Sequence, residues 1–549
     1  MKYSFIVLTY NSASTIINCL DSIYQQEYKK FEVLVIDDGS FDSTLSLLDK
    51  KKSIYPNLKI FKREKSGISS SRNFGIIHSK GDYILFIDSD DTIVNGSLNI
   101  INNELIKEKV DLLKCRVNCI DKKKYDFRFE CPLFGTIKGK NALLLFCESN
   151  KIFATPWSYV INKDMFMKNK FQFAEDTLHE DYGIMPIIIY NAKKIKSTNI
   201  DFYNYIKSNN STVSNNLLNN EISRMNDFLI HTYNLLNYFS LKCKKVDEKK
   251  IVINYFLERL NIKYNHLNMT IKNCINNYLY ESIYDYKNIE YRDKISLDIE
   301  KKFFDYNFEN FPIKYEVNIK LVVKLAKQIF DNELKSVILG GSAGKNKAIV
   351  GWSDLDIYII LKKYSFSKVK SFENKLIKFN LHIGVTYYSV LEVEKNMIDN
   401  KTKIMIYEKT NYNVNPTLYG KNCFNNVSYI EIVKNDISNI PNIVHEFRRM
   451  NISILNNKDL FNKKYLKKLL VLIKCFLNSK EIFTYCYVDA IDNFINIVNN
   501  SRYLTKYLEF DIIHEINNYE MEMNKIIEFG KIATDFIIEE MEKQIWIKE

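Results

Sequence analysis

The chain has 549 residues, of which 46% are hydrophobic and 26% are charged. This composition is typical of a folded globular protein and excludes a disordered chain, and at about 150 residues per domain the length predicts three or four domains. The net charge of +12 comes from lysines that recur throughout the chain. The simplest interpretation of this charge is a solvated basic surface. The second interpretation is peripheral contact with an anionic membrane face. No nucleic-acid partner is expected, because the sequence contains no module of basic and aromatic residues.

No apolar run reaches the ~18 residues that a membrane span needs. Met1 is followed almost at once by an apolar strand, and no signal peptide precedes that strand. The sequence therefore predicts a cytoplasmic protein, with the inner face of the cell membrane as the place for any peripheral contact.

The first ninety residues alternate between apolar strands and amphipathic helices. Strands are predicted at 5–8, 31–36, 58–61 and 83–87, and helices at 14–26 and from about 66 onward. This alternation predicts an α/β fold with a parallel sheet, in which ligands bind at the carboxyl ends of the strands. A nicotinamide-binding Rossmann domain is the natural rival, but no G-x-G-x-x-G motif follows the first strand.

Three carboxylates, Asp88, Asp90 and Asp91, follow the fourth strand directly. Carboxylates repel one another, so such a cluster at a strand end is typical of a cation site. A divalent metal there can bridge the phosphates of a nucleotide and neutralise a departing diphosphate.

Four segments strengthen this interpretation: LTYN at 8–11, VIDDGS at 35–40, SGISSSRNFGI at 66–76 and LFIDSDD at 85–91. In their order and spacing they resemble the family 2 glycosyltransferases of the GT-A fold. The resemblance continues to HEDY at 179–182 and covers about residues 1–215. It implies a metal-dependent, inverting transfer of a hexose from a nucleotide-sugar.

The resemblance also implies the catalytic groups. Asp181 corresponds to the base that removes the proton of the acceptor hydroxyl, and Glu180 to the residue that orients the acceptor or the base. A plain alternative stays open: two acidic residues at a helix start are favoured by the helix dipole without any catalytic role.

Further positions of the same motifs are implied to bind the base of the donor. Thr9 lies in the first motif, and Tyr10 would stack on the nucleobase. Asp38 would accept the imide N–H of the base, which favours uracil and hence a UDP-sugar. Asp38 is also a suitable turn residue in Asp-Gly-Ser.

The remaining donor contacts involve charge. Arg72 would meet a phosphate beside a helix N-terminus. Asp88 would bind ribose or metal, Asp90 the metal, and Asp91 the donor sugar or the acceptor. The expected metal is Mg²⁺ or Mn²⁺.

Residues 216–315 carry apolar residues at helical spacing, which predicts a helical extension or connector. A second motif follows. Gly341 and Ser342 end a predicted strand, and Asp354 and Asp356 lie on the next one. This pattern resembles the nucleotidyltransferase superfamily related to DNA polymerase β, where the Gly-Ser turn holds phosphates and the aspartates hold magnesium.

That resemblance predicts a nucleotidyltransferase-like domain at 316–434, with Mg²⁺ and a nucleoside triphosphate as its ligands, and a C-terminal helical bundle at 435–549. The superfamily brings a third carboxylate from a later strand. The candidate strand at 379–388 has none, so the activity of this domain stays open.

The sequence thus predicts a bifunctional-looking enzyme that transfers a sugar to a bacterial surface polysaccharide or glycolipid. Two alternatives remain. Nucleotidyl transfer could be the main activity, with a first domain (1–215) that only binds carbohydrate, or the chain could be a non-catalytic assembly protein.

Overall fold

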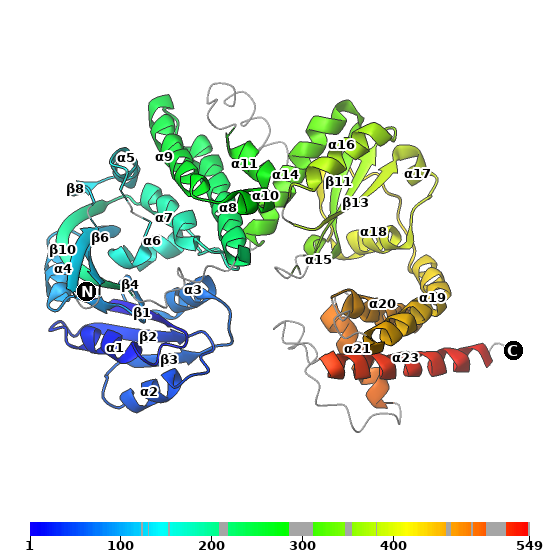
Figure 1. The fold of residues 1–549 in the computed structure, drawn as a ribbon, viewed down its shortest axis with the longest axis horizontal. Coiled ribbons are helices and arrows are strands. Elements are labelled where there is room, and N and C mark those ends of the chain that lie inside the picture. Colours follow the sequence, from blue (N-terminus) through cyan, green and yellow to red (C-terminus); the bar gives the residue numbers. More distant parts are fainter. Residues whose placement is uncertain are drawn as a thin grey trace. The chain divides into compact units, whose positions relative to one another are not determined.

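The computed structural model describes all residues except 122–123, 130, 152–153, 208–217, 285–310, 346–347, 349–353, 380, 457–462, 485–486, 501–522 and 547–549. The chain divides into two compact units. The first comprises Met1–Ile329 and Phe366–His382, and the second Phe330–Ser365 and Ile383–Glu549. Figure 1 shows the elements of both units, coloured along the sequence.

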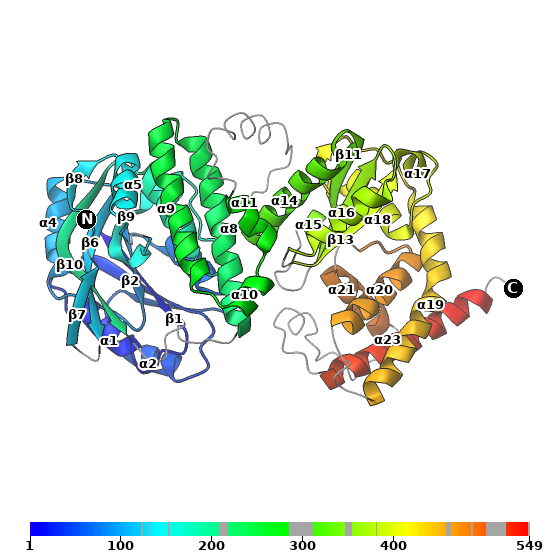
Figure 2. The same cartoon turned by 45° about the horizontal axis from the view of Figure 1, so that its top comes forward.

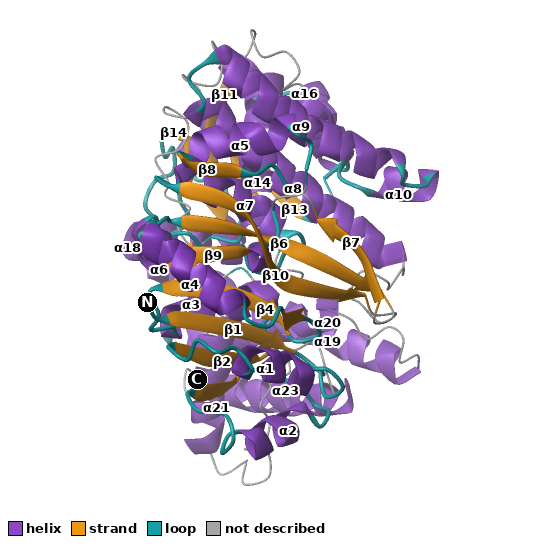
Figure 3. Cartoon of the chain, turned by 90° about the vertical axis from the view of Figure 1, so that its left-hand side faces the viewer, coloured by secondary structure: helices purple, strands orange, loops and turns teal. Residues whose placement is uncertain are grey.

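The first unit is built on one large mixed sheet, whose strands run side by side in Figure 3. Its order is β3-β2-β1-β4-β9-β6-β10-β5, and β7 and β8 pair with β6 and β10. The strands are β1 (Tyr3–Thr9), β2 (Phe31–Asp37), β3 (Leu58–Lys62), β4 (Tyr83–Asp88), β5 (Thr92–Ile93), β6 (Leu112–Asp121), β7 (Lys124–Phe129), β8 (Phe134–Ile137), β9 (Tyr159–Asn162) and β10 (Ile195–Lys207).

The parallel sheet predicted for the first ninety residues is confirmed: β1 pairs in parallel with both β2 and β4, and β2 pairs in parallel with β3. β1 and β2 are buried along their whole length, as expected for strands covered on both faces by helices. The intervening helices are α1 (Ile16–Tyr24), α2 (Thr44–Lys51), α3 (Ile68–His78) and α4 (Ser97–Lys107).

Further helices follow β8 and complete the first unit. They are α5 (Gly139–Glu148), α6 (Lys163–Lys168), α7 (Glu180–Asn191), α8 (Leu218–Lys242), α9 (Val246–Asn265), α10 (Met269–Cys274), α11 (Asn277–Tyr284), α14 (Ile313–Phe330) and α16 (Phe366–Leu376). Where the structure describes the chain after residue 215, for which a helical extension or connector was predicted, the elements are the helices α8 to α11. Figures 1 and 2 both show α8 and α9 as a pair of long helices, and α8 packs against α7.

The second unit contains a four-stranded sheet of order β13-β12-β11-β14 and a group of helices. Its elements are β11 (Leu334–Gly340), α15 (Gly341–Gly344), β12 (Leu355–Leu361), β13 (Ile383–Ser389), α17 (Val390–Glu394), α18 (Asn400–Tyr412), β14 (Thr417–Gly420), α19 (Tyr429–Asn456), α20 (Lys463–Ser479), α21 (Tyr487–Asn500) and α23 (Met523–Trp546). Apolar residues of the last four helices form one core cluster. Among the described helices, none combines the length and apolarity needed to cross a membrane.

Candidate active site

The sheet of the first unit brings three sequence motifs to one edge. β1 and β4 are paired so that Leu8 lies opposite Asp88, and β1 and β2 so that Thr9 lies opposite Asp37. The residues that follow these strands therefore lie close together, as predicted for the carboxyl ends of parallel strands.

An aromatic side chain stands exposed at this edge. The ring of Tyr10 is 38% exposed, and the ring of Phe41, 81% exposed, lies 6.2 Å away from it, edge to face. The ammonium group of Lys65 lies 4.5 Å from the centre of the Tyr10 ring and donates a hydrogen bond to its hydroxyl group. Beside Tyr10, Thr9 is buried, and its hydroxyl has no hydrogen-bond partner in the described structure.

The carboxylate of Asp38 accepts several hydrogen bonds from the start of α3. The backbone N–H of Ser66 lies 2.8 Å from one oxygen, and the backbone N–H of Gly67 lies 2.9 Å from the other. The hydroxyls of Ser66 and Ser71 also donate to Asp38. Asp38 therefore holds the loop ahead of α3, and its contact with a donor base stays a prediction.

The three carboxylates at the end of β4, Asp88, Asp90 and Asp91, differ in their surroundings. Burial raises the pKa of Asp88 to about 6 and also raises the pKa of Asp90. Burial, and then the charge of Asp88, raise the pKa of Asp91 to about 8. Burial and mutual repulsion thus disfavour the ionised form of the three carboxylates. A bound cation would offset both effects.

Asp91 is 1% exposed and ties its loop to β10. One of its oxygens accepts a hydrogen bond from the hydroxyl of Tyr203, at 2.7 Å, and the other accepts from the backbone N–H of Ile206, at 2.7 Å. The indole ring of Trp157 stacks on the ring of Tyr203 at 4.7 Å. Both oxygens thus have partners within the protein, and a contact of Asp91 with sugar stays a prediction.

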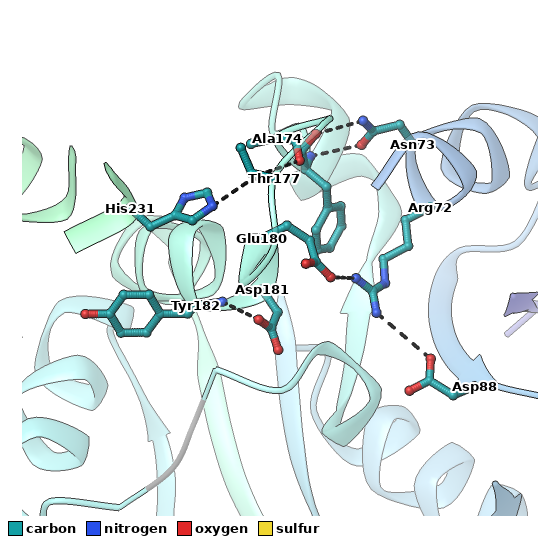
Figure 4. A network of polar contacts seen from close by, with 10 residues as sticks. Arg72, Asn73, Asp88, Ala174, Thr177, Glu180, Asp181, Tyr182 and His231 are labelled. Atoms are coloured by element: carbon teal, nitrogen blue, oxygen red, sulfur yellow. Dashed lines mark hydrogen bonds and ion pairs between the residues drawn. The ribbon is translucent and has the colours of Figure 1, made fainter. Parts of the chain in front are cut away.

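Arg72 joins Asp88, at the end of β4, to Glu180 of the HED motif (Figure 4). Its guanidinium group is ion-paired with Glu180, and another of its nitrogens lies 3.9 Å from the carboxylate of Asp88. The side chain is 3% exposed, and its Nε atom has no partner in the described structure. The structure thus gives Arg72 two carboxylate partners, and its contact with a phosphate stays a prediction.

Asp181 lies in the first turn of α7, next to Glu180. Its N-terminal neighbour His179 adopts left-handed backbone angles, φ 63° and ψ 30°, at the N-cap of the helix. Burial, and then the charge of Glu180, raise the pKa of Asp181, whereas the charge of Arg72 opposes this shift. Asp88 also contributes to the shift, so the two motifs that are 93 positions apart in the sequence share one electrostatic environment. A carboxylate with a raised pKa is a stronger base than an ordinary one.

α7 and α8 approach each other closely at Gly183. A Cβ atom at this position would overlap the imidazole of His231, a buried side chain whose ring lies 3.1 Å from the hydroxyl of Thr177. Gly183 is therefore required for α8 to lie against the helix that carries Asp181.

The change Gly183→Ala is expected to destabilise the fold by roughly 1–3 kcal/mol, the usual range for overpacking. The measurement is the midpoint of thermal unfolding of the full-length chain. Gly135→Ala in β8 is the control, because no atom lies within 4 Å of its Cβ position. An alanine at position 183 that left the midpoint unchanged would contradict the close approach of α7 and α8.

Asp88 and Asp90 fit a divalent cation by their chemistry. They are carboxylates whose ionisation is disfavoured by burial, and Mg²⁺ is typically held by one or two carboxylates together with substrate phosphates and water. In the part of the chain that the structure describes, no group of three or more potential ligands lies close enough to hold an ion.

In the second unit, the predicted residues Gly341 and Asp356 lie close together, but the position beside them does not carry a third carboxylate. β11 and β12 pair so that Gly340 lies opposite Asp356, and a Cβ atom at Gly341, where φ is +63°, would overlap the Asp356 carboxylate. Asp356 is ion-paired with Lys401 of α18, at 2.6 Å, a partner that the sequence pattern did not indicate. On β13 the residue beside Asp356 is Gly384.

The strand predicted at 379–388 thus carries a glycine where a third carboxylate would be expected, and it begins later, at Ile383. Asp354 lies just before β12, which begins at Leu355. Among the described residues, this site does not supply three carboxylates, and we derive no nucleotidyl transfer step from it.

Comparison with known proteins supports the interpretation of the first unit. The model of the family described as "Glycosyl transferase family 2" matches residues 4–166. A cholesterol galactosyltransferase of Borreliella burgdorferi is 28% identical over 213 residues, which are 37% of this chain and 59% of that protein. A poly(ribitol-phosphate) beta-N-acetylglucosaminyltransferase, TarS, of Staphylococcus aureus is 29% identical over 185 residues, which are 32% of this chain and 31% of that protein. The chain thus spans less than two thirds of the length of these relatives.

Among solved structures, residues 1–349 of S. aureus TarS in complex with UDP-GlcNAc are similar to this chain at 21% identity, with a TM-score of 0.37. The match covers 54% of this chain and 92% of that one. The family model matches the part of the chain that contains the four motifs between residues 8 and 91, and it ends before the HED motif at 179–181.

Proposed function

We propose that the first unit is an inverting glycosyltransferase that moves a sugar from a nucleotide-sugar, a UDP-sugar, to a hydroxyl group of a surface polysaccharide or a glycolipid. One observation carries this proposal. Arg72 links Asp88, at the end of the metal-motif strand, to Glu180, beside the candidate base Asp181. The candidate metal ligand Asp88 and the candidate base Asp181 are therefore proposed to belong to one site.

On the donor side, Tyr10 stacks on the nucleobase, and Asp88 and Asp90 would hold Mg²⁺ or Mn²⁺. A cation held by these two carboxylates would compensate the negative charge that develops on the departing diphosphate. Arg72 acts as a positioning residue, because its buried guanidinium fixes Glu180 relative to Asp88.

On the acceptor side, Asp181 accepts the proton of the attacking hydroxyl group. Attack from the face opposite the leaving diphosphate inverts the anomeric centre, and only one base is needed for this direct displacement. Glu180, held by Arg72, orients the acceptor or Asp181.

The names of the relatives support the substrate class. They describe transfer of sugars to cholesterol and to poly(ribitol-phosphate), so both a glycolipid and a polymer acceptor fit the proposal.

A thermal-shift screen of nucleotides and UDP-sugars with Mn²⁺ tests the donor, since a ligand that binds only the folded state raises its stability. Release of UDP from the stabilising UDP-sugar then tests catalysis. If no nucleotide-sugar stabilised the chain, the proposed donor site would be contradicted. If a nucleotide-sugar bound but was not turned over with any glycan or lipid acceptor tested, a non-catalytic binding module would be favoured.

For the second unit, we propose binding of a nucleoside triphosphate with Mg²⁺ at Gly341, Ser342, Asp354 and Asp356. The ammonium of Lys401 competes with the cation for Asp356. Removing it by Lys401→Ala is therefore expected to strengthen binding of Mg²⁺–ATP, whereas Asp354→Asn with Asp356→Asn is expected to abolish it.

Calorimetry on the full-length chain measures both changes. Sugar transfer by the double variant is expected to stay at the wild-type rate, because the two sites are built on separate sheets. The absence of binding of any common triphosphate would make the second unit a structural module. A folded double variant that no longer transferred sugar would show that the two units are coupled.

A further inference from the structure

The HED motif begins with a residue in an uncommon backbone conformation. The backbone angles of His179, φ 63° and ψ 30°, lie in the left-handed region, where residues other than glycine are uncommon. Such a conformation persists only when the surrounding structure determines it, and such residues cluster at active sites. Because this turn leads directly into α7, the contacts that hold it also decide where Glu180 and Asp181 lie.

Two buried side chains of α8 hold the segment just before this turn. The carboxylate of Asp227 accepts a hydrogen bond from the backbone N–H of Leu178, at 3.1 Å. The Nε2 atom of His231 lies 3.1 Å from the hydroxyl oxygen of Thr177. Asp227 and His231 are four positions apart on one helix and therefore lie on the same side of it. Figure 4 shows the contact between His231 and Thr177 together with Asp181.

The segment just after the turn is held by the same helix. The hydroxyl of Tyr182 lies 3.1 Å from the hydroxyl of Thr232, and the ring of Tyr182 stacks on the ring of Phe228 at 4.4 Å. Helix α8 therefore contacts the chain on both sides of the left-handed residue. This double attachment provides the external determination that an uncommon backbone conformation requires.

Asp227 is itself fixed from a second direction. One of its carboxylate oxygens lies 3.5 Å from the ammonium nitrogen of Lys314 on α14. A buried carboxylate is costly unless it is paired and hydrogen-bonded, and Asp227 satisfies this requirement through Lys314 and the N–H of Leu178. The side chain therefore has a defined position from which it can hold the loop before α7.

We propose that Asp227 and His231 are positioning residues for Asp181. They hold the left-handed turn that directs the start of α7, and so keep the carboxylate of Asp181 in line with the acceptor hydroxyl. This inference rests on the proposed function, in which Asp181 is the base. Neither residue touches the substrate, because each acts through the loop at Thr177 and Leu178. Helix α8 is thereby part of the catalytic machinery and not only a connector.

The test is steady-state kinetics of the full-length chain with a UDP-sugar and Mn²⁺. A misplacement of about 1 Å can cost roughly a hundredfold in rate, so Asp227→Ala is expected to lower kcat at least roughly tenfold. The affinity for UDP with Mn²⁺, measured by calorimetry, is expected to stay at the wild-type value. Asp227→Asn keeps an oxygen that can accept from Leu178 and is expected to retain most of kcat.

Asn226→Ala is the matched control for a loss of stability. Asn226 is the neighbour of Asp227 on α8, is also buried, and accepts a hydrogen bond from the backbone N–H of Asn276, at 2.8 Å. This contact holds the segment between α10 and α11 instead of the loop before α7. Both alanine variants are expected to lower the midpoint of thermal unfolding, but only Asp227→Ala is expected to lower kcat at a temperature well below both midpoints.

A second pair of variants tests the contact with His231 and also serves if Asp227→Ala does not fold. Thr177→Val removes the hydroxyl with little change of shape, and it is expected to lower kcat without changing the affinity for UDP. Thr177→Ser keeps the hydroxyl and is expected to restore kcat. A role in folding alone would not produce this split between kcat and donor affinity.

Wild-type kcat in Asp227→Ala and Thr177→Val would overturn the inference. An equal loss of kcat in Asn226→Ala would also overturn it, because the loss would then follow stability and not the position of Asp181. Failure of the proposed function has a different signature. In that case the wild-type chain releases no UDP from any UDP-sugar, and the inference falls with it.

Discussion

Asp90→Asn is expected to nearly abolish sugar transfer while the fold stays intact. An amide is neutral and is a weaker ligand for a hard cation than a carboxylate, so the divalent ion that compensates the diphosphate would be lost. Metal stabilisation of a transition state amounts to several kcal/mol, and each 1.4 kcal/mol is tenfold in rate, so a loss of roughly a hundredfold or more is expected.

The fold is expected to survive because burial already disfavours the charge of Asp90. The measurements are UDP release in Mn²⁺ and the midpoint of thermal unfolding. Asp49→Asn, the same change at an exposed position of α2, controls for the loss of one negative charge. Undiminished turnover of the variant, or of the wild type in the presence of a chelator, would contradict the assignment of Asp90 as a metal ligand.

Local sequence patterns were sufficient for the core of the first unit. The strands β1 to β4 and the cluster after β4 could be predicted because a buried apolar run and the polar residues at its end are adjacent in the sequence. The boundaries were less certain: the helix predicted at 14–26 extends only over Ile16–Tyr24, since Ser12 and Thr15 lie in the turn ahead of it.

The partners of these residues could not be predicted, because they depend on how distant segments pack. Arg72 and Glu180 are separated by 108 positions, and Asp91 and Tyr203 by 112. Resemblance to a family indicated that Arg72 and Asp91 matter, but not that each would be held by side chains of the same protein. Such contacts need the order of the strands in the sheet, which one sequence does not reveal.

The positions of charged residues outside the motifs could not be predicted either. Lys401 and Lys263 are two of many lysines, and nothing in their local sequence distinguishes them. Only the packing of α18 brings one to Asp356, and only the packing of α9 brings the other to His179. The sequence therefore left open whether residues 216–315 form an extension or a connector, whereas in the structure α8 packs against α7, which carries Asp181.

Asp181→Asn is expected to bind the donor as the wild type does but to lose transfer by a hundredfold or more, the usual contribution of a positioned general base. The amide cannot take the proton of the acceptor hydroxyl, whereas the groups around the nucleotide are unchanged. Asp164→Asn, in the first turn of α6, is the matched control, because it removes an exposed carboxylate from an equivalent helical position.

The dependence of kcat on pH separates a base from a merely structural acid. Because the pKa of Asp181 is raised, the group becomes protonated as the pH falls through a range above the ~4 of an ordinary carboxyl. At saturating donor and metal, which keep Asp88 and Asp90 ionised, wild-type activity is therefore expected to fall on the acidic side at a pH above that value. The residual activity of Asp181→Asn is expected to lack this acidic limb. If donor affinity collapsed in the variant while the acidic limb remained, Asp181 would belong to the donor pocket, and the base would have to be sought elsewhere on α7.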